Sequence, residues 1–350
     1  MVVTVGTLLA DDNASLDNLF SDTELDGAPF SAWAAAGSNA EISSIREIDI
    51  ISIEPIVSFN PITSEYDTTS FVSAIPNDDI DDSDVFNDLI DFLNSRKLNE
   101  TDHVRIHIPA GVYNFSDQIV MHSNISLKGA GSNLTELRFL IRADSTGTTM
   151  SEADCKKDAI FVNGSGTQPA QRIYNVGIED LKIVRIREGL SAREVKAMVG
   201  DYDYVDDIQA YWGNNIAIRR ATNCWVTGVE SENTFRNHVT LEFAEHITVS
   251  GVYFHHANNY GPNGYGYGVG IWDSGNNLVE NSIFVHLRHG VTIVDGSWFN
   301  VIGYNYFRDQ HSYAELPIST IVLPFPNEIE QKWSDIAIHE VPPRKNRNKA

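Results

Sequence analysis

Two sets of short apolar segments recur along the chain at nearly constant spacing, and this repeat limits the possible folds more than any other feature. The first ladder consists of Cys224–Val229, Ile247–Val252, Leu278–Ile283 and Val301–Tyr306, whose last residues are 23, 31 and 23 positions apart. The second consists of Ile216–Ile218, Val239–Leu241, Val269–Ile271 and Val291–Ile293, with spacings of 23, 30 and 22 positions. Both ladders place an insertion of seven or eight residues between Val252 and Val269, so two independent registers agree.

Within each segment the apolar residues alternate, which is the period of a β-strand. Short strands with Asn, Gly and Asp at the corners, repeated about every 23 residues, predict a solenoid in which equivalent side chains stack. A propeller blade needs roughly 40 residues and a leucine-rich repeat needs its Leu/Asn frame, and neither pattern is present. We therefore expect three parallel sheets, with one inward column formed by Ile216, Val239, Val269 and Val291.

The segment before the ladders begins with a helical pattern. Asp84–Asn94 carries apolar residues at positions 86, 89, 90 and 93, and it is followed by VRIHIPAGVY at 104–113 and ISLKGAG at 125–131. This order of helix, strand and coil resembles the opening of the pectate-lyase-like superfamily, over about residues 76–310. The resemblance implies an all-β fold, a right-handed single-stranded parallel β-helix with an N-terminal capping helix. The superfamily contains lyases, glycosidases, esterases, epimerases and phage adhesins.

The pattern divides the chain into three regions. Residues 1–75 form an acidic N-terminal extension, residues 76–310 the β-helix domain, and residues 311–350 an irregular C-terminal segment that suggests a fragment of a longer protein. Within the domain, we expect residues 143–170 to form a lateral loop and Lys182–Asp207 an insertion between coils.

Charge and composition limit the classes of molecule that the chain is expected to bind. The net charge is −23, and residues 1–98 contribute −16 of it with 19 acidic and 3 basic residues. Nucleic acid is not expected as a partner, because its binding needs a basic surface. No apolar run approaches the roughly 18 residues of a membrane span. Val2–Ala10 has no basic residue before it, so we expect a secreted protein whose signal peptide is not part of this sequence.

The cysteines are not expected to form a disulfide. Cys155 and Cys224 are 69 residues apart, about three coils, which separates stacked positions by roughly 14 Å. That distance exceeds the reach of a disulfide, so both are predicted to be buried free thiols.

Stacking in the ladders gathers chemically active side chains on one wall. The column just before the second strand reads Gly213, Arg236, Gly266 and Arg288, and outward positions on the strands carry Glu242 and Trp272. The insertion brings further histidines and tyrosines beside them. The predicted catalytic residues are His256, Tyr265, Tyr267, Arg288 and His289. The predicted substrate-binding residues are Arg236, His238, Glu242, Asn259, Tyr260 and Trp272.

This set fits cleavage of a uronate polymer by β-elimination. Arg236 and Arg288 would neutralise the carboxylate, His256 or His289 would remove the α-proton, and Tyr265 or Tyr267 would protonate the leaving oxygen. Trp272 and the tyrosines offer faces for sugar rings. The string Leu287–Gly290 (LRHG) also resembles an element of chondroitinase-B-like and alginate lyases, although Gly266 stands where the partner Lys of that family is expected. The expected function is an extracellular polysaccharide lyase with a long-chain acidic glycan as substrate.

Two other functions and one metal remain open. Asp273 and Asp295 occupy equivalent positions one coil apart, as a retaining glycoside hydrolase requires, but Asp is also an ordinary turn residue. A non-catalytic adhesin or tailspike-like module would use the same wall for binding alone. No cofactor is required. Calcium is possible, but the acidic run Asp78–Asp84 is more simply a solvated charge run before the helix.

Overall fold

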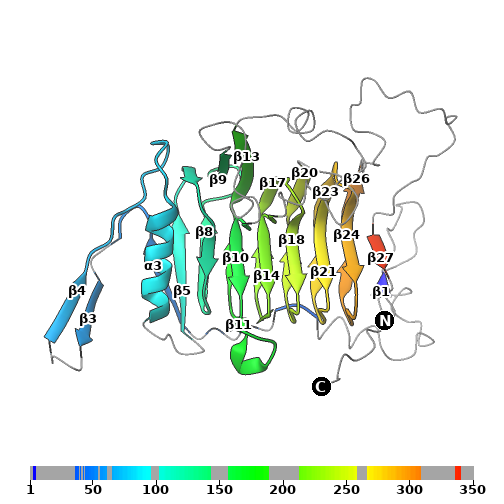
Figure 1. The fold of residues 1–350 in the computed structure, drawn as a ribbon, viewed down its shortest axis with the longest axis horizontal. Coiled ribbons are helices and arrows are strands. Elements are labelled where there is room, and N and C mark those ends of the chain that lie inside the picture. Colours follow the sequence, from blue (N-terminus) through cyan, green and yellow to red (C-terminus); the bar gives the residue numbers. More distant parts are fainter. Residues whose placement is uncertain are drawn as a thin grey trace, which may run out of the picture.

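The computed structural model describes residues 3–4, 36–38, 40, 42, 44–53, 56–60, 65–95, 102–142, 157–188, 213–257, 266–308 and 336–339. The chain visits three long sheets in turn, coil after coil, and neighbouring strands of each sheet run parallel. Figure 1 shows the strands of successive coils side by side along the axis of the molecule. The fold is a parallel β-helix, as the ladders predict.

We name the sheets in the order in which each coil visits them. Sheet A contains β1 (Val3–Thr4), β2 (Ser44–Asp49), β5 (Asp102–Ile108), β8 (Ile125–Gly129), β12 (Gly177–Glu179), β16 (Trp225–Thr227), β19 (Thr248–Ser250), β22 (Leu278–Glu280) and β25 (Val301–Gly303). Sheet B contains β6 (Gly111–Phe115), β9 (Thr135–Arg142), β13 (Lys182–Glu188), β17 (Glu230–Thr234), β20 (Tyr253–Ala257), β23 (Ile283–Val285) and β26 (Tyr306–Arg308). Sheet C contains β7 (Ile119–Met121), β10 (Ile160–Asn163), β14 (Ile216–Arg219), β18 (Asn237–Glu242), β21 (Tyr267–Trp272), β24 (His289–Val294) and β27 (Ile336–His339).

Smaller elements stand outside these sheets. A parallel pair is formed by β11 (Ile173–Tyr174) and β15 (Ala221–Thr222), and an antiparallel hairpin by β3 (Ile56–Asn60) and β4 (Glu65–Thr69). Among the described residues the helices are α3 (Ser83–Ser95) and the short 3₁₀ helix η1 (Pro169–Gln171). No helix in the described ranges is long and apolar enough to cross a bilayer.

The interior of the solenoid is made of stacked apolar columns. Ile216, Val239, Val269 and Val291 are paired in register on four successive coils, and each is fully buried. The predicted inward column is therefore confirmed. Cys224 is also in the core as a free thiol, and burial raises its pKa to about 12, whereas Cys155 lies outside the described residues.

The capping helix that the apolar spacing predicts is present in the structure. Phe86, Leu89, Ile90 and Leu93 of α3 are buried, and the helix lies beside β5 at one end of the solenoid (Figure 1). Within the acidic run before it, Asp82 is buried rather than solvated and accepts a hydrogen bond from the backbone N–H of Asn114. Burial raises the pKa of Asp82 to about 6.

The coils extend into segments where the sequence shows no repeat. β10 lies inside the predicted loop 143–170, and β13 opens the predicted insertion Lys182–Asp207, so both expectations are wrong for these residues. Each strand pairs in register with its neighbours in the sheet. Beyond the 76–310 range, β2 pairs with β5 and β27 pairs with β24.

The stacked core gives a direct stability prediction. Ile271 is fully buried between Leu241 and Ile293 in the inward stack, so Ile271→Ala is expected to lower the free energy of unfolding by about 2–5 kcal/mol. Val294→Ala, on an outward position of the next strand, is expected to cost less than about 1 kcal/mol. Urea denaturation followed by circular dichroism measures both, and equal losses would contradict the assigned strand orientation.

Candidate functional site

The outer face of sheet B carries two columns of side chains that follow the solenoid axis. The register of β9, β13, β17, β20, β23 and β26 places the first column as Glu136, Lys182, Glu230, Tyr253, Ile283 and Tyr306. The second column reads Arg138, Val184, Glu232, His255, Val285 and Arg308. Successive members are about 4.8 Å apart because they sit on neighbouring strands.

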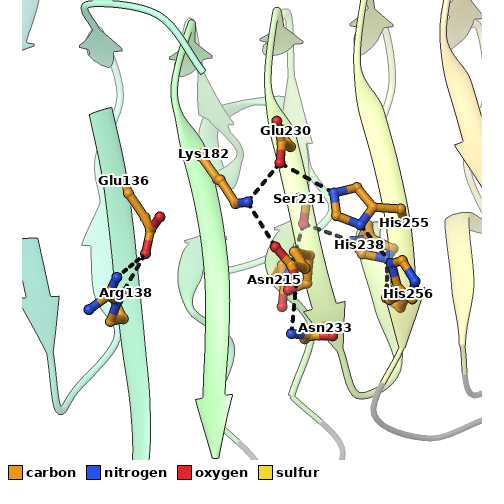
Figure 2. Close-up of polar contacts among 11 residues, drawn as sticks. Glu136, Arg138, Lys182, Asn215, Glu230, Ser231, Asn233, His238, His255 and His256 are labelled. Atoms are coloured by element: carbon orange, nitrogen blue, oxygen red, sulfur yellow. Dashed lines mark hydrogen bonds and ion pairs between the residues drawn. The ribbon is translucent and has the colours of Figure 1, made fainter. Parts of the chain in front are cut away.

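A charged cluster lies in the middle of this face, and we call Lys182, Glu230, Glu232 and His255 the sheet B cluster. Lys182 Nζ lies 2.8 Å from Glu230 Oε1 and 2.8 Å from Glu232 Oε2. His255 Nε2 lies 3.3 Å from Glu230 Oε1. Figure 2 shows Lys182 and His255 on opposite sides of Glu230.

Lys182 and Glu232 are charged. Burial alone would lower the pKa of Lys182, but its hydrogen bonds to Glu230 and Glu232 outweigh burial and raise that pKa. Burial alone would raise the pKa of Glu232, but Lys182, aided by His255 and His256, lowers it. An ammonium therefore stands between two carboxylates.

His256 is the next-to-last residue of β20, shortly before the chain passes from sheet B to sheet C, and we call this end of β20 the corner. Its Nδ1 lies 2.8 Å from Nδ1 of His255 (Figure 2). The side chain is exposed, whereas that of His255 is buried. Its backbone has φ 54°, the left-handed region, which is uncommon for a residue other than glycine. On the next coil, the His286 ring lies 4.9 Å from the His256 ring.

His238 is buried beneath this corner, which corrects its assignment as a substrate-binding residue. Its Nε2 lies 3.1 Å from the carbonyl oxygen of His256, and its Nδ1 lies 2.8 Å from Ser231 Oγ. Burial, followed by the nearby charge of His255, holds the pKa of His238 well below its usual value. A neutral ring without surface exposure supports the backbone of His256 and does not reach a polymer outside.

Two arginines stack on aromatic rings on the sheet C side of the corner. The guanidinium carbon of Arg236 lies 5.1 Å from the centre of the Trp272 ring, and that of Arg288 lies 5.7 Å from the Tyr267 ring. Such stacking leaves the planar edge of a guanidinium able to bind a carboxylate. A Cβ on Gly270 would lie 2.0 Å from atoms of the Trp272 indole, so glycine is needed for the indole to lie against the strand.

Tyr267 remains a protonated phenol. It is only 6% exposed, and burial raises its pKa even though the charges of Arg288 and Arg236 act in the opposite direction. His289 is also buried, and its ring packs against that of Tyr267 at 5.1 Å.

The remaining predicted site residues divide into three groups. Glu242 is paired with Arg219 at 3.1 Å, and Arg219 also bonds Asp158, so Glu242 belongs to a salt-bridge network. Asp273 and Asp295 adopt left-handed backbone conformations directly after β21 and β24, as turn residues do. Asn259, Tyr260 and Tyr265 lie outside the described residues.

The sheet B cluster is also the one group among the described residues whose ligand atoms could meet at a metal. The donor atoms of Glu230, Glu232 and His255 all lie within 4.8 Å of one another. Calcium prefers six to eight oxygen ligands, and Lys182 already neutralises both carboxylates. This donor set does not fit calcium.

Sequence reasoning missed Lys182, Glu230 and Glu232. The signal was present, because positions 230, 253, 283 and 306 are spaced by 23, 30 and 23 residues and share the insertion of the two ladders. Extending the alignment to the strand between the ladders would have placed Glu232 beside His255.

No protein-family model and no curated protein sequence matches this chain. Among solved structures, a glycosyl hydrolase-like protein from Parabacteroides merdae is 12% identical, with 68% of this chain and 95% of that chain covered and a TM-score of 0.47. A double mutant of the tailspike protein of E. coli bacteriophage HK620 is 17% identical, with coverages of 74% and 40% and a TM-score of 0.46. The catalytic domain of a GH87 alpha-1,3-glucanase in complex with nigerose is 15% identical, with coverages of 68% and 35% and a TM-score of 0.37. Likeness at this level carries no inference about chemistry, and none of the three is named as a pectate lyase.

Proposed function

We propose that this chain is a polysaccharide lyase that binds an acidic glycan across the outer face of sheet B and cleaves it by β-elimination at the corner with sheet C. The observation that carries the proposal is that three kinds of group lie on neighbouring elements of the same coils, in β20, in β21 and just before β18 and β24. They are an exposed histidine, His256, a protonated phenol, Tyr267, and guanidinium groups stacked on aromatic rings.

The outer face of sheet B has the character of a sugar-binding surface. Tyr253, Ile283 and Tyr306 are 39%, 44% and 55% exposed on three successive coils. Large apolar side chains that stack in one exposed row are unusual on a protein without a partner. Their spacing of about 4.8 Å per coil suits an extended polymer, whose rings can stack on the tyrosine faces.

Each corner residue has a role in elimination. Arg288, with Arg236, binds the uronate carboxylate and makes the neighbouring α-proton more acidic. His256 removes that proton, a carbon–carbon double bond forms, and the bond to the glycosidic oxygen breaks. Tyr267 donates its proton to the departing oxygen. The phenol is suited to this role because it holds its proton at neutral pH.

Hydrolysis is the second candidate, and a different observation favours it. The carboxylate oxygens of Glu230 and Glu232 lie within 4.8 Å, near the roughly 5 Å separation of a retaining pair. However, retaining hydrolysis also needs a protonated carboxylic acid. Both glutamates face Lys182, and the pKa of Glu232 is lowered, so neither is prepared to act as the acid. Asp273 and Asp295 are turn residues.

A screen of acidic polymers distinguishes these functions. The protein is incubated with alginate, pectate, glycosaminoglycans and algal sulfated glycans, and both new reducing ends and the ultraviolet absorbance of unsaturated uronates are followed. Elimination raises both signals on at least one polymer. Reducing ends without absorbance would show hydrolysis, and binding without either signal would show an adhesin. Either result would overturn the proposal. Because such polymers are extracellular, the proposal includes secretion.

A further inference from the structure

The contacts of Glu230 fix the proton position on His255. Glu230 Oε1 faces Lys182 Nζ at 2.8 Å and His255 Nε2 at 3.3 Å. A carboxylate oxygen paired with an ammonium acts as an acceptor. Nε2 of His255 therefore carries a proton and donates it to Glu230.

The contact between the two histidines then fixes which ring nitrogen of His256 carries the proton. Their Nδ1 atoms are 2.8 Å apart, so one of the two must carry a proton. In neutral His255 the proton is on Nε2, which leaves Nδ1 as an acceptor. His256 must donate from Nδ1, and in neutral His256 the lone pair is then on Nε2.

The backbone of His256 is held from the other side. Nε2 of His238 donates to the His256 carbonyl, because a carbonyl oxygen can only accept. The His238 ring stacks on Phe254 at 5.1 Å, and its Nδ1 accepts from Ser231. The ring of His256 is thus oriented by its contact with His255, and the backbone of His256 is held by the buried His238.

The charges of the sheet B cluster favour the imidazolium that forms when His256 takes a proton, whereas the guanidinium groups of Arg236 and Arg288 on the sheet C side oppose it. Glu230 and Glu232 each carry a negative charge and Lys182 a positive one, so the sheet B cluster has a net negative charge. The titratable and charged groups near the two histidines are Glu230 and Glu232 of β17 with Lys182 of β13 bound to them, His238 of β18, Tyr253 of β20, His286 after β23, and, on the sheet C side, Arg236, Tyr267 and Arg288.

We infer that Glu230 and His255 are positioning residues that fix the tautomer of His256 and present its Nε2 as the base at the corner. The catalytic meaning of this relay rests on the proposed function, but the relay itself does not. A half-buried carboxylate and a buried imidazole act here on a second imidazole, in the way that the acid of a catalytic triad orients its histidine.

The tautomers can be measured without a substrate. Nitrogen NMR of histidine-labelled protein near pH 8 is expected to show the Nε2–H form for His255 and the Nδ1–H form for His256. In Glu230→Ala, His256 is expected to shift toward the Nε2–H form that free histidine favours. Glu136→Ala, two strands away in the same column, is the matched control and should leave His256 unchanged. Wild-type His256 in the Nε2–H form would overturn the inference even if Glu230→Ala fails to fold.

Activity provides the second readout. Glu230→Ala is expected to lower kcat at least about tenfold with little change in KM. Removing a negative charge destabilises the His256 imidazolium and lowers its pKa, so the acidic limb of the pH–kcat profile should move to lower pH. An unchanged profile would contradict the relay. If the wild-type protein cleaves no polymer, the proposed function fails while the NMR result still decides the relay.

Discussion

His256→Asn is expected to lower the rate of glycan cleavage by about a hundred- to ten-thousand-fold, the usual loss when a general base is removed. Asparagine is chosen because it tolerates the left-handed backbone at this position better than most residues. The carbonyl of residue 256 can still accept from His238 Nε2. The free energy of unfolding should therefore stay within about 1 kcal/mol of the wild-type value.

The matched control for this change is His246→Asn. His246 has φ 57°, almost the same as His256, but it stands before β19, at the corner between sheets C and A. Its substitution makes the same change of side chain in the same backbone conformation and should leave cleavage near the wild-type rate. Initial rates and urea denaturation of both variants are the measurements. Equal activity of the two variants would remove His256 from the mechanism.

Tyr267→Phe is expected to have an effect of similar size, about a hundred- to ten-thousand-fold on kcat. The change removes one hydroxyl and preserves the ring that packs against Arg288 and His289, so the fold and the stack should survive. Because burial raises the pKa of Tyr267 above its ordinary value, wild-type activity should persist into the alkaline range, where an exposed tyrosine would lose its proton.

Tyr306→Phe provides the control for the hydroxyl. Tyr306 is exposed on the outer face of sheet B, and phenylalanine retains its stacking surface. We expect kcat near the wild-type value and at most a small rise in KM. If Tyr267→Phe is as active as Tyr306→Phe, the leaving oxygen takes its proton from another group.

The fold could be predicted because the strands of sheets A and C alternate cleanly. Val239 and Leu241 are apolar core residues while Thr240 and Glu242 beside them are polar, and the same apolar pattern returns on each coil with one shared insertion. The helix α3 was visible for a similar reason, since its apolar residues follow the helical period. β10 was missed because the sequence around Ile160 is polar and irregularly spaced.

The site was predicted less well because alternation fails at the corners. His238 directly precedes the inward Val239 and is nevertheless buried, because the chain turns there and the ring stacks on Phe254. The importance of Lys182 depends on contacts with Glu230 and Glu232 from the next coil, nearly 50 positions later. Periodicity can place such residues in register, but only side-chain geometry shows that they meet as one ionised cluster.

The mass balance of a single cleavage tests elimination at this corner most directly. A defined uronate oligosaccharide from the polymer that the protein cleaves is cut by the wild-type protein, and the two fragments are weighed by mass spectrometry. Elimination adds no water, so we predict fragment masses that sum to the mass of the substrate. The double bond should lie at the new non-reducing end of one fragment, and the other fragment should carry the new reducing end. Fragments that sum to the substrate plus one water would show hydrolysis and contradict the account.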